Sequence, residues 1–120
     1  MSALCAAVVS LCLSPGYATA DEAAHAAISF TLPLATRYEY GGAIVQCEDK
    51  FHFTEPMTSH SRDSLDLAVR TPATCTLVAT FHTHQRSHRP SPADLAMTKR
   101  LRVTLYIGVV KDRSIVKELP

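Results

Sequence analysis

The segment from residue 75 to residue 94 constrains the fold most, because it joins an apolar run to a pair of histidines. Cys75 to His84 is rich in β-branched and apolar side chains, which predicts a strand. A six-residue loop follows. Ser91 and Pro92 then form a typical helix start, with serine at the cap and proline at the first helical position. The segment therefore predicts a strand, a short loop and a helix over residues 91–102, with the histidines where the strand ends.

The two histidines are candidate metal ligands. His82 and His84 lie two apart on the predicted strand, so their side chains project from one face with Cα atoms about 6.5–7 Å apart. Both rings can reach one ion, and Asp94 is a candidate third ligand. Three protein ligands and one open position are typical of catalytic zinc. Two alternatives stay open: a polar surface pair for the histidines, and a plain capping box for Ser91 and Asp94.

A competing ligand set adds His88 to the paired histidines, as in a short cupin-like box. That arrangement needs a carboxylate after the pair and another histidine a strand or two later. No histidine follows His88 in the sequence, and we therefore set this interpretation aside.

A hydrolytic metal site also needs a general base, and Glu39 is the candidate. It opens the segment Glu39-Tyr40-Gly41-Gly42, whose paired glycines allow the backbone to approach another chain or a ligand closely. The rival carboxylates are Glu48, Asp49 and Glu55. They lie in a predicted turn and loop, where we expect them to be solvated.

The remaining segments alternate between apolar runs and turns, and predict further strands and one more helix. The predicted helix covers residues 21–30, and the predicted strands cover residues 39–47, 51–54, 64–70, 103–110 and 114–119. Residues 55–62 are predicted to form a loop. In the helix predicted over residues 91–102, we expect Leu95, Met97 and Leu101 to form the apolar face that covers the core. The net charge of +1 and the scattered charged residues disfavour a nucleic-acid partner.

The first twenty residues predict a secretory signal peptide, and hence a secreted or periplasmic protein. Residues 4–13 are apolar except for Ser10, a run well short of the roughly 20 residues of a membrane span. Small residues from Ala18 to Ala20 suit a cleavage site, which leaves residues 21–120 as one small domain. The alternative is an apolar helix kept in the mature domain, since no Lys or Arg precedes the run. No later segment is apolar enough to cross a membrane.

Two cysteines, Cys47 and Cys75, remain in the predicted domain. In an exported protein such a pair can form a disulfide. Strand alternation argues against it. Cys75 is an odd number of residues from His82 and His84 on one predicted strand, so its side chain points to the opposite face. Cys47 is an even number of residues from Glu39, so it shares the face of Glu39, which we expect to be the histidine face. A bulge at Gly41-Gly42 would reverse this argument, so both outcomes stay open.

Together these residues resemble the JAMM, or MPN-plus, metallopeptidases. The pattern of that family is a glutamate on an early strand, often with a glycine pair, then His-Ser/Thr-His, a short loop and Ser-x-x-Asp. The chain is most similar to small bacterial JAMM-like domains of unknown function, which end in a Leu-Tyr-x-Gly strand, here residues 105–108. This closer resemblance covers nearly all of residues 21–120. It implies an α/β (α+β) fold with a central mixed sheet flanked by helices, a cytidine-deaminase-like architecture.

The resemblance also implies an activity, a zinc-dependent hydrolase of peptide or isopeptide bonds that uses a metal-activated water. It implies that His82, His84 and Asp94 hold Zn²⁺. Glu39 would act as general base and then acid, and Ser91 would hydrogen-bond the oxyanion or the water. The implied partner is a protein or peptide substrate, and no pattern predicts an oligomeric state.

Two departures from the family pattern leave a second hypothesis open. The loop between His84 and Ser91 is one residue shorter than usual, and Gln85 stands where the peptidases usually carry proline. The chain can therefore also be a catalytically inactive JAMM-like module that binds a partner or belongs to a toxin system. Arg86 and Arg89 of this loop either bind a substrate carboxylate or are solvated.

Overall fold

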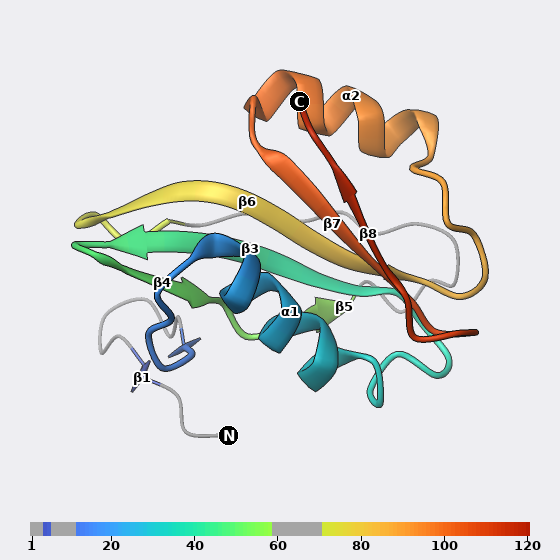
Figure 1. Cartoon of the computed structure of the whole chain (residues 1–120), viewed down its shortest axis with the longest axis horizontal. Coiled ribbons are helices and arrows are strands. Elements are labelled where there is room, and N and C mark those ends of the chain that lie inside the picture. Colours follow the sequence, from blue (N-terminus) through green and yellow to red (C-terminus); the bar gives the residue numbers. More distant parts are fainter. Residues whose placement is uncertain (1–3, 6–11, 59–70) are drawn as a thin grey trace.

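The computed structural model describes residues 4–5, 12–58 and 71–120, and in these ranges a mixed six-stranded sheet lies between two helices (Figure 1). The helices are α1 (Ala20–Thr31) and α2 (Pro92–Leu101). The strands are β1 (Leu4–Cys5), β2 (Cys12–Leu13), β3 (Tyr40–Cys47), β4 (Lys50–Phe53), β5 (Met57–Thr58), β6 (Cys75–His84), β7 (Thr104–Val109) and β8 (Ile115–Glu118). The predicted α+β class with a central mixed sheet is confirmed.

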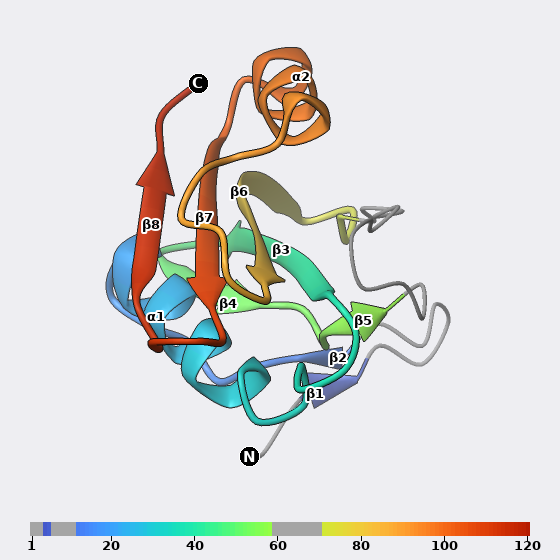
Figure 2. The same cartoon turned by 90° about the vertical axis from the view of Figure 1, so that its right-hand side faces the viewer.

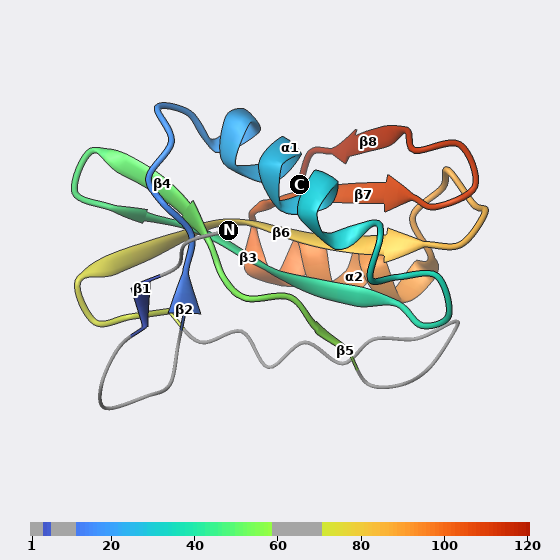
Figure 3. The same ribbon diagram turned by 90° about the horizontal axis from the view of Figure 1, so that it is seen from below.

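The strand order β4-β3-β6-β7-β8 contains one parallel pair, β6 with β7, and β5 pairs with the start of β3. Parallel neighbours need a crossover connection, and the loop after β6 together with α2 provides it. Figure 3 shows α1 on one face of the sheet and α2 on the other. Figure 2, which views the molecule from the side, shows the sheet between α1 and α2.

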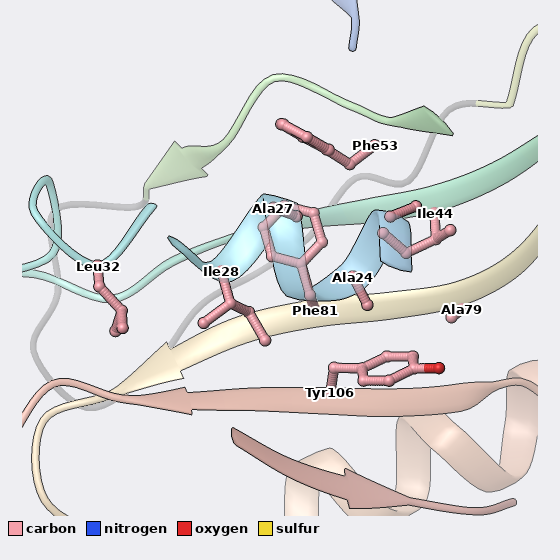
Figure 4. Close-up of a cluster of buried hydrophobic side chains, with 10 residues drawn as sticks. Ala24, Ala27, Ile28, Leu32, Ile44, Phe53, Ala79, Phe81 and Tyr106 are labelled. Carbon is pink, nitrogen blue, oxygen red and sulfur yellow. The ribbon is translucent and has the colours of Figure 1, made fainter. Parts of the chain in front are cut away.

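The main core lies between α1 and the sheet, where Figure 4 shows its side chains meeting. The helix contributes small residues and one isoleucine, all fully buried: Ala23, Ala24, Ala27 and Ile28. A Cβ built on Gly108 of β7 would lie only 2.5 Å from Cγ2 of Ile28. Small residues on both sides therefore set the close approach of α1 to the sheet.

The opposite face of the sheet has a smaller core, and α2 covers it lightly. Thr98 is the one buried residue of α2, and Leu95 is 46% exposed. The prediction that Leu95 covers the core is therefore wrong, while Met97 and Leu101 are half-buried. Since packing holds α2 weakly, the residues that cap its ends matter more for its position.

Most predicted elements are confirmed to within two residues of their ends. The predicted loop of residues 55–62 is wrong at Met57–Thr58, because the backbone at the start of β3 pairs with these two residues. The predicted strand of residues 64–70 lies outside the described residues.

Cys47 and Cys75 form a disulfide, and they lie directly opposite each other on β3 and β6. The register of the two strands shifts at Ile44 and Val45, where Val78 is the extra residue of a β-bulge in β6. The bulge turns Cys75 to the same face as Cys47. The parity argument against the disulfide is therefore wrong, and the reversing bulge lies in β6 rather than at Gly41-Gly42.

The segment that precedes α1 joins the fold. The backbone N–H of Ser14 donates to β4, and Tyr17 exchanges both backbone hydrogen bonds with Phe51. The side chain of Thr19 caps α1 by accepting a backbone N–H from its first turn. Residues 14–19, which the sequence assigns to the predicted signal peptide, thus pair with the sheet and cap the helix. Neither helix in the described ranges is long and apolar enough to span a membrane.

We predict that a chain beginning at Asp21, the N-terminus expected after cleavage, is less stable than one that retains residues 13–20. The shorter chain lacks the pairing of Tyr17 and the cap of Thr19, and loss of such a cap alone costs about 1 kcal/mol. Urea unfolding of both chains measures the difference, and Thr19→Ala in the longer chain isolates the share of the cap. Identical unfolding midpoints for the two chains would contradict this prediction.

Candidate metal centre and its cleft

The pairing of β3 with β6 brings the predicted base and the paired histidines together. Gly41 lies directly opposite His82. Glu39, two residues before Gly41, therefore continues toward His84, two residues after His82. Because alternate residues share a face, all three side chains lie on one side of the sheet. One ligand atom from each of Glu39, His82 and His84 lies within 4.8 Å of those of the other two.

Asp94 completes a compact set of donor atoms with the histidines. Its Oδ2 lies 3.1 Å from Nε2 of His84 and 3.3 Å from Nε2 of His82, and the two Nε2 atoms are 3.2 Å apart. In a tetrahedral zinc site with bonds of about 2.0 Å, ligand atoms lie about 3.3 Å from one another. The three donors therefore match one face of a zinc tetrahedron, and two imidazoles with a carboxylate are ligands that zinc accepts.

The loop after β6 fixes the orientation of His84. Its Nδ1 lies 3.1 Å from the carbonyl oxygen of Ser87. A carbonyl oxygen only accepts, so Nδ1 is the atom that donates, and Nε2 of the neutral ring keeps its lone pair. Metal-binding histidines commonly make such a second hydrogen bond. The ring of His84 also stacks on that of His82, with 5.0 Å between centroids.

The N-terminal cap of α2 positions Asp94. The backbone N–H of Ser91 donates to Oδ2 of Asp94 at 2.8 Å, and the backbone N–H of Asp94 donates to Oγ of Ser91 at 3.1 Å. The predicted capping box is therefore present. The oxygen that accepts from Ser91 is the one that faces the histidines. Capping and metal binding are thus compatible uses of a single carboxylate.

The charge of Asp94 suits a cation at this place. Burial opposes its ionisation, but the hydrogen bonds that His82 and His84 donate to it when their rings are protonated outweigh burial and hold the pKa of the carboxyl well below its usual value. The same hydrogen bond with Asp94 raises the pKa of His84, while burial acts in the opposite direction. Asp94 is therefore an anion at neutral pH, and its field favours a positive ion between the rings.

A cleft of about 670 Å³ opens beside the donors. The described residues that line it come from the segment before β3, the end of β6 and the loop before α2: Thr36, Arg37, Glu39, His84, Gln85, Arg86, Ser87, Arg89, Pro90 and Ser91. Glu39 is only 6% exposed. Because the Oγ of Ser91 accepts a hydrogen bond within the capping box, its own hydrogen can still be donated into the cleft.

The rejected candidates lie elsewhere. His88 pairs with Asp112 at 2.6 Å, and both side chains are about half exposed. Glu48, Asp49 and Glu55 are exposed, as expected for solvated carboxylates.

Sequence reasoning missed the contact that joins the two walls of the cleft. The side-chain amide of Gln85 donates to the carbonyl oxygen of Ala35 at 2.8 Å, which ties the loop after β6 to the segment between α1 and β3. Proline, usual at this position in the peptidases, has no such donor. Arg37, two residues after Ala35, also lines the cleft, and its proximity in sequence to Glu39 was the only signal that could have indicated this.

Comparison with known families agrees with this geometry. The family described as prokaryotic homologs of the JAB domain matches residues 21–118. The chain belongs to this family. The crystal structure of a JAB1/MPN domain protein from Archaeoglobus fulgidus is similar to this JAB domain in fold, with a TM-score of 0.52 at 19% identity, covering 79% of this chain and 85% of that one. A search of curated proteins gave no match. The resemblance to JAMM/MPN domains is thus confirmed.

We predict that Ser91→Ala destabilises this JAB domain by about 1 kcal/mol, because the first turn of α2 loses its cap. Zinc affinity should fall about tenfold, because the backbone N–H of Asp94 loses its acceptor, Oγ of Ser91, and the first turn of α2 that carries the Asp94 carboxylate is held less firmly. The backbone N–H of residue 91 still donates to Oδ2 of Asp94 in this variant. Urea unfolding and zinc titration against a competing chelator measure the two effects. Ser29→Ala, at an exposed position within α1, is the control. Wild-type zinc affinity in Ser91→Ala would contradict the role of the cap in orienting Asp94.

Proposed function

We propose that this JAB domain is a zinc-dependent hydrolase of peptide or isopeptide bonds. The observation that carries the proposal is the set of three donor atoms 3.1–3.3 Å apart, with the carboxyl group of Glu39 beside them. His82, His84 and Asp94 would hold the ion. Zinc bound there would polarise the scissile carbonyl group and lower the pKa of the attacking water.

Glu39 would move the proton in this reaction. Its carboxyl group is buried and lies within 4.8 Å of the histidine donors, in reach of a water between them. The water gives a proton to Glu39 as its oxygen bonds to the carbonyl carbon. The carbon–nitrogen bond then breaks, and Glu39 returns the proton to the leaving amine.

Ser91 would stabilise the charge that develops on the carbonyl oxygen. Its hydroxyl lines the cleft beside His84 and keeps its hydrogen for donation. The capping box holds the side chain in place before the reaction begins, and such preorganised donors are the effective ones in oxyanion stabilisation.

We also propose that the protein acts outside the cytoplasm, secreted or periplasmic. The disulfide between Cys47 and Cys75 supports this, because such bonds persist in oxidising compartments.

A second candidate function is an inactive JAMM-like module that binds a partner or belongs to a toxin system. The altered loop favours it, because Gln85 fixes that loop to the opposite wall of the cleft. This candidate predicts full zinc occupancy without hydrolysis of any peptide.

Metal analysis of the purified protein beside His84→Ala tests the metal centre. We expect close to stoichiometric zinc in the wild type and little in the variant, because one of the three donors is lost. His88→Ala is the matched control, since that histidine pairs with Asp112 away from the donor set. Equal zinc content in wild type and His84→Ala would end the proposal of a zinc hydrolase.

Hydrolysis of a peptide library by Glu39→Gln tests the general base. The amide cannot take a proton, so we expect turnover to fall by a factor of about 10²–10⁴ while zinc stays bound. Loss of zinc from this variant would show that Glu39 is a ligand. Unchanged turnover would show that another group accepts the proton.

A further inference from the structure

We propose that three arginines of the cleft, Arg37, Arg86 and Arg89, bind a carboxylate group of the substrate. This inference rests on the proposed function and narrows its substrate class to peptides that carry a carboxylate close to the scissile bond. We call the three side chains the arginine rim.

The arginine rim comes from both walls of the cleft. Arg37 belongs to the segment before β3, and Arg86 and Arg89 belong to the loop before α2. The hydrogen bond from Gln85 to Ala35 holds these two segments together. The three cationic side chains therefore face one space, although they are far apart in the sequence.

The arginine rim has no acidic partner within the described residues. The ion pairs in these ranges involve other side chains, and one of them joins the neighbouring His88 to Asp112. Arg37 lies over the ring of Tyr38, at 5.7 Å from its centroid. Stacking of this kind leaves the N–H groups at the edge of a guanidinium able to donate.

The charge of the cleft favours an anion. Among the described residues that line the cleft, Glu39 is the one carboxylate, and it is buried beside the metal donors. Three exposed guanidinium groups thus outweigh it in a chain whose net charge is only +1. A guanidinium matches a carboxylate with two parallel hydrogen bonds, and a cleft concentrates the field of its charges.

Peptides offer such a group in two ways, as the free carboxylate at the C-terminus or as an Asp or Glu side chain. Both present the same two oxygens to an arginine. The chemistry recognised is therefore a carboxylate, and the experiment below distinguishes the two sources.

Peptide binding to the full chain carrying Glu39→Gln tests the inference apart from the proposed function, because the probes stay intact whether or not the wild type cleaves them. The probes are one Gly-Ala hexapeptide with a neutral N-terminal fluorophore in three forms. The first has a free C-terminal carboxylate, the second a C-terminal amide, and the third a C-terminal amide and one glutamate. Fluorescence polarisation gives the three dissociation constants.

We expect at least one carboxylate form to bind about tenfold tighter than the neutral amide, as for a hydrogen bond to a charged group. Added salt should reduce this ratio, because the guanidinium groups are exposed. Adding Arg86→Gln and Arg89→Gln, or Arg37→Gln, should bring the ratio close to one. Arg100→Gln, exposed on α2 and outside the cleft lining, should leave it unchanged.

Two results would overturn the inference. One is equal binding of the three forms, and the other is a preference that survives both sets of rim substitutions. Zinc content is measured on every variant, which separates an effect on the arginine rim from one on the metal centre. A wild type that binds carboxylate forms through the arginine rim but hydrolyses nothing would overturn the proposed function and leave this inference standing.

Discussion

The antiparallel register of β3 with β6 is the constraint on which the site depends. It sets Gly41 against His82 and so directs Glu39 toward His84. A slip of one residue would turn Glu39 to the face covered by α1, because side chains alternate across a strand. The side chain of Thr83 holds the alignment near the site, where its Oγ1 accepts the backbone N–H of Tyr40 at 3.0 Å.

The remaining ligand depends on a helix that packs weakly. α2 buries only Thr98, so the direction of Asp94 comes from the cap at Ser91 rather than from core contacts. A ligand that binds only the folded state stabilises the segments that must be ordered to form its site. An ion held by Asp94 and both histidines would therefore also anchor the start of α2 to the end of β6.

The sequence predicted those parts of the fold whose signals are local. The limits of β6 were predicted correctly, because β-branched and apolar residues fill it and a polar loop ends it. The start of α2 was predicted from Ser91 and Pro92, whose chemistry suits a cap and a first turn. The expectation that Glu39 lies on the histidine face came from its candidate role as base, and the register of β3 with β6 brings it there.

The parts that could not be predicted depend on tertiary contacts. Val78 suits a regular strand as well as a bulge, so nothing in the sequence indicated the change of parity that joins Cys47 to Cys75. The short strand β5 exists only because the start of β3 has an edge to pair with. Arg37 lies in a segment without a motif, and the hydrogen bond of Gln85 that ties this segment to the loop after β6 crosses between two loops.

The disulfide has a consequence for the pairing of β3 with β6. Cys47 and Cys75 lie on β3 and β6, at the end of the ladder far from His82, His84 and Glu39, the residue that directly precedes β3. If the strands paired one step out of line, the two thiols would point to opposite faces, and two steps out would draw them too far apart to bond. The register that permits the bond is therefore the same one that brings Glu39 to the face of His82 and His84.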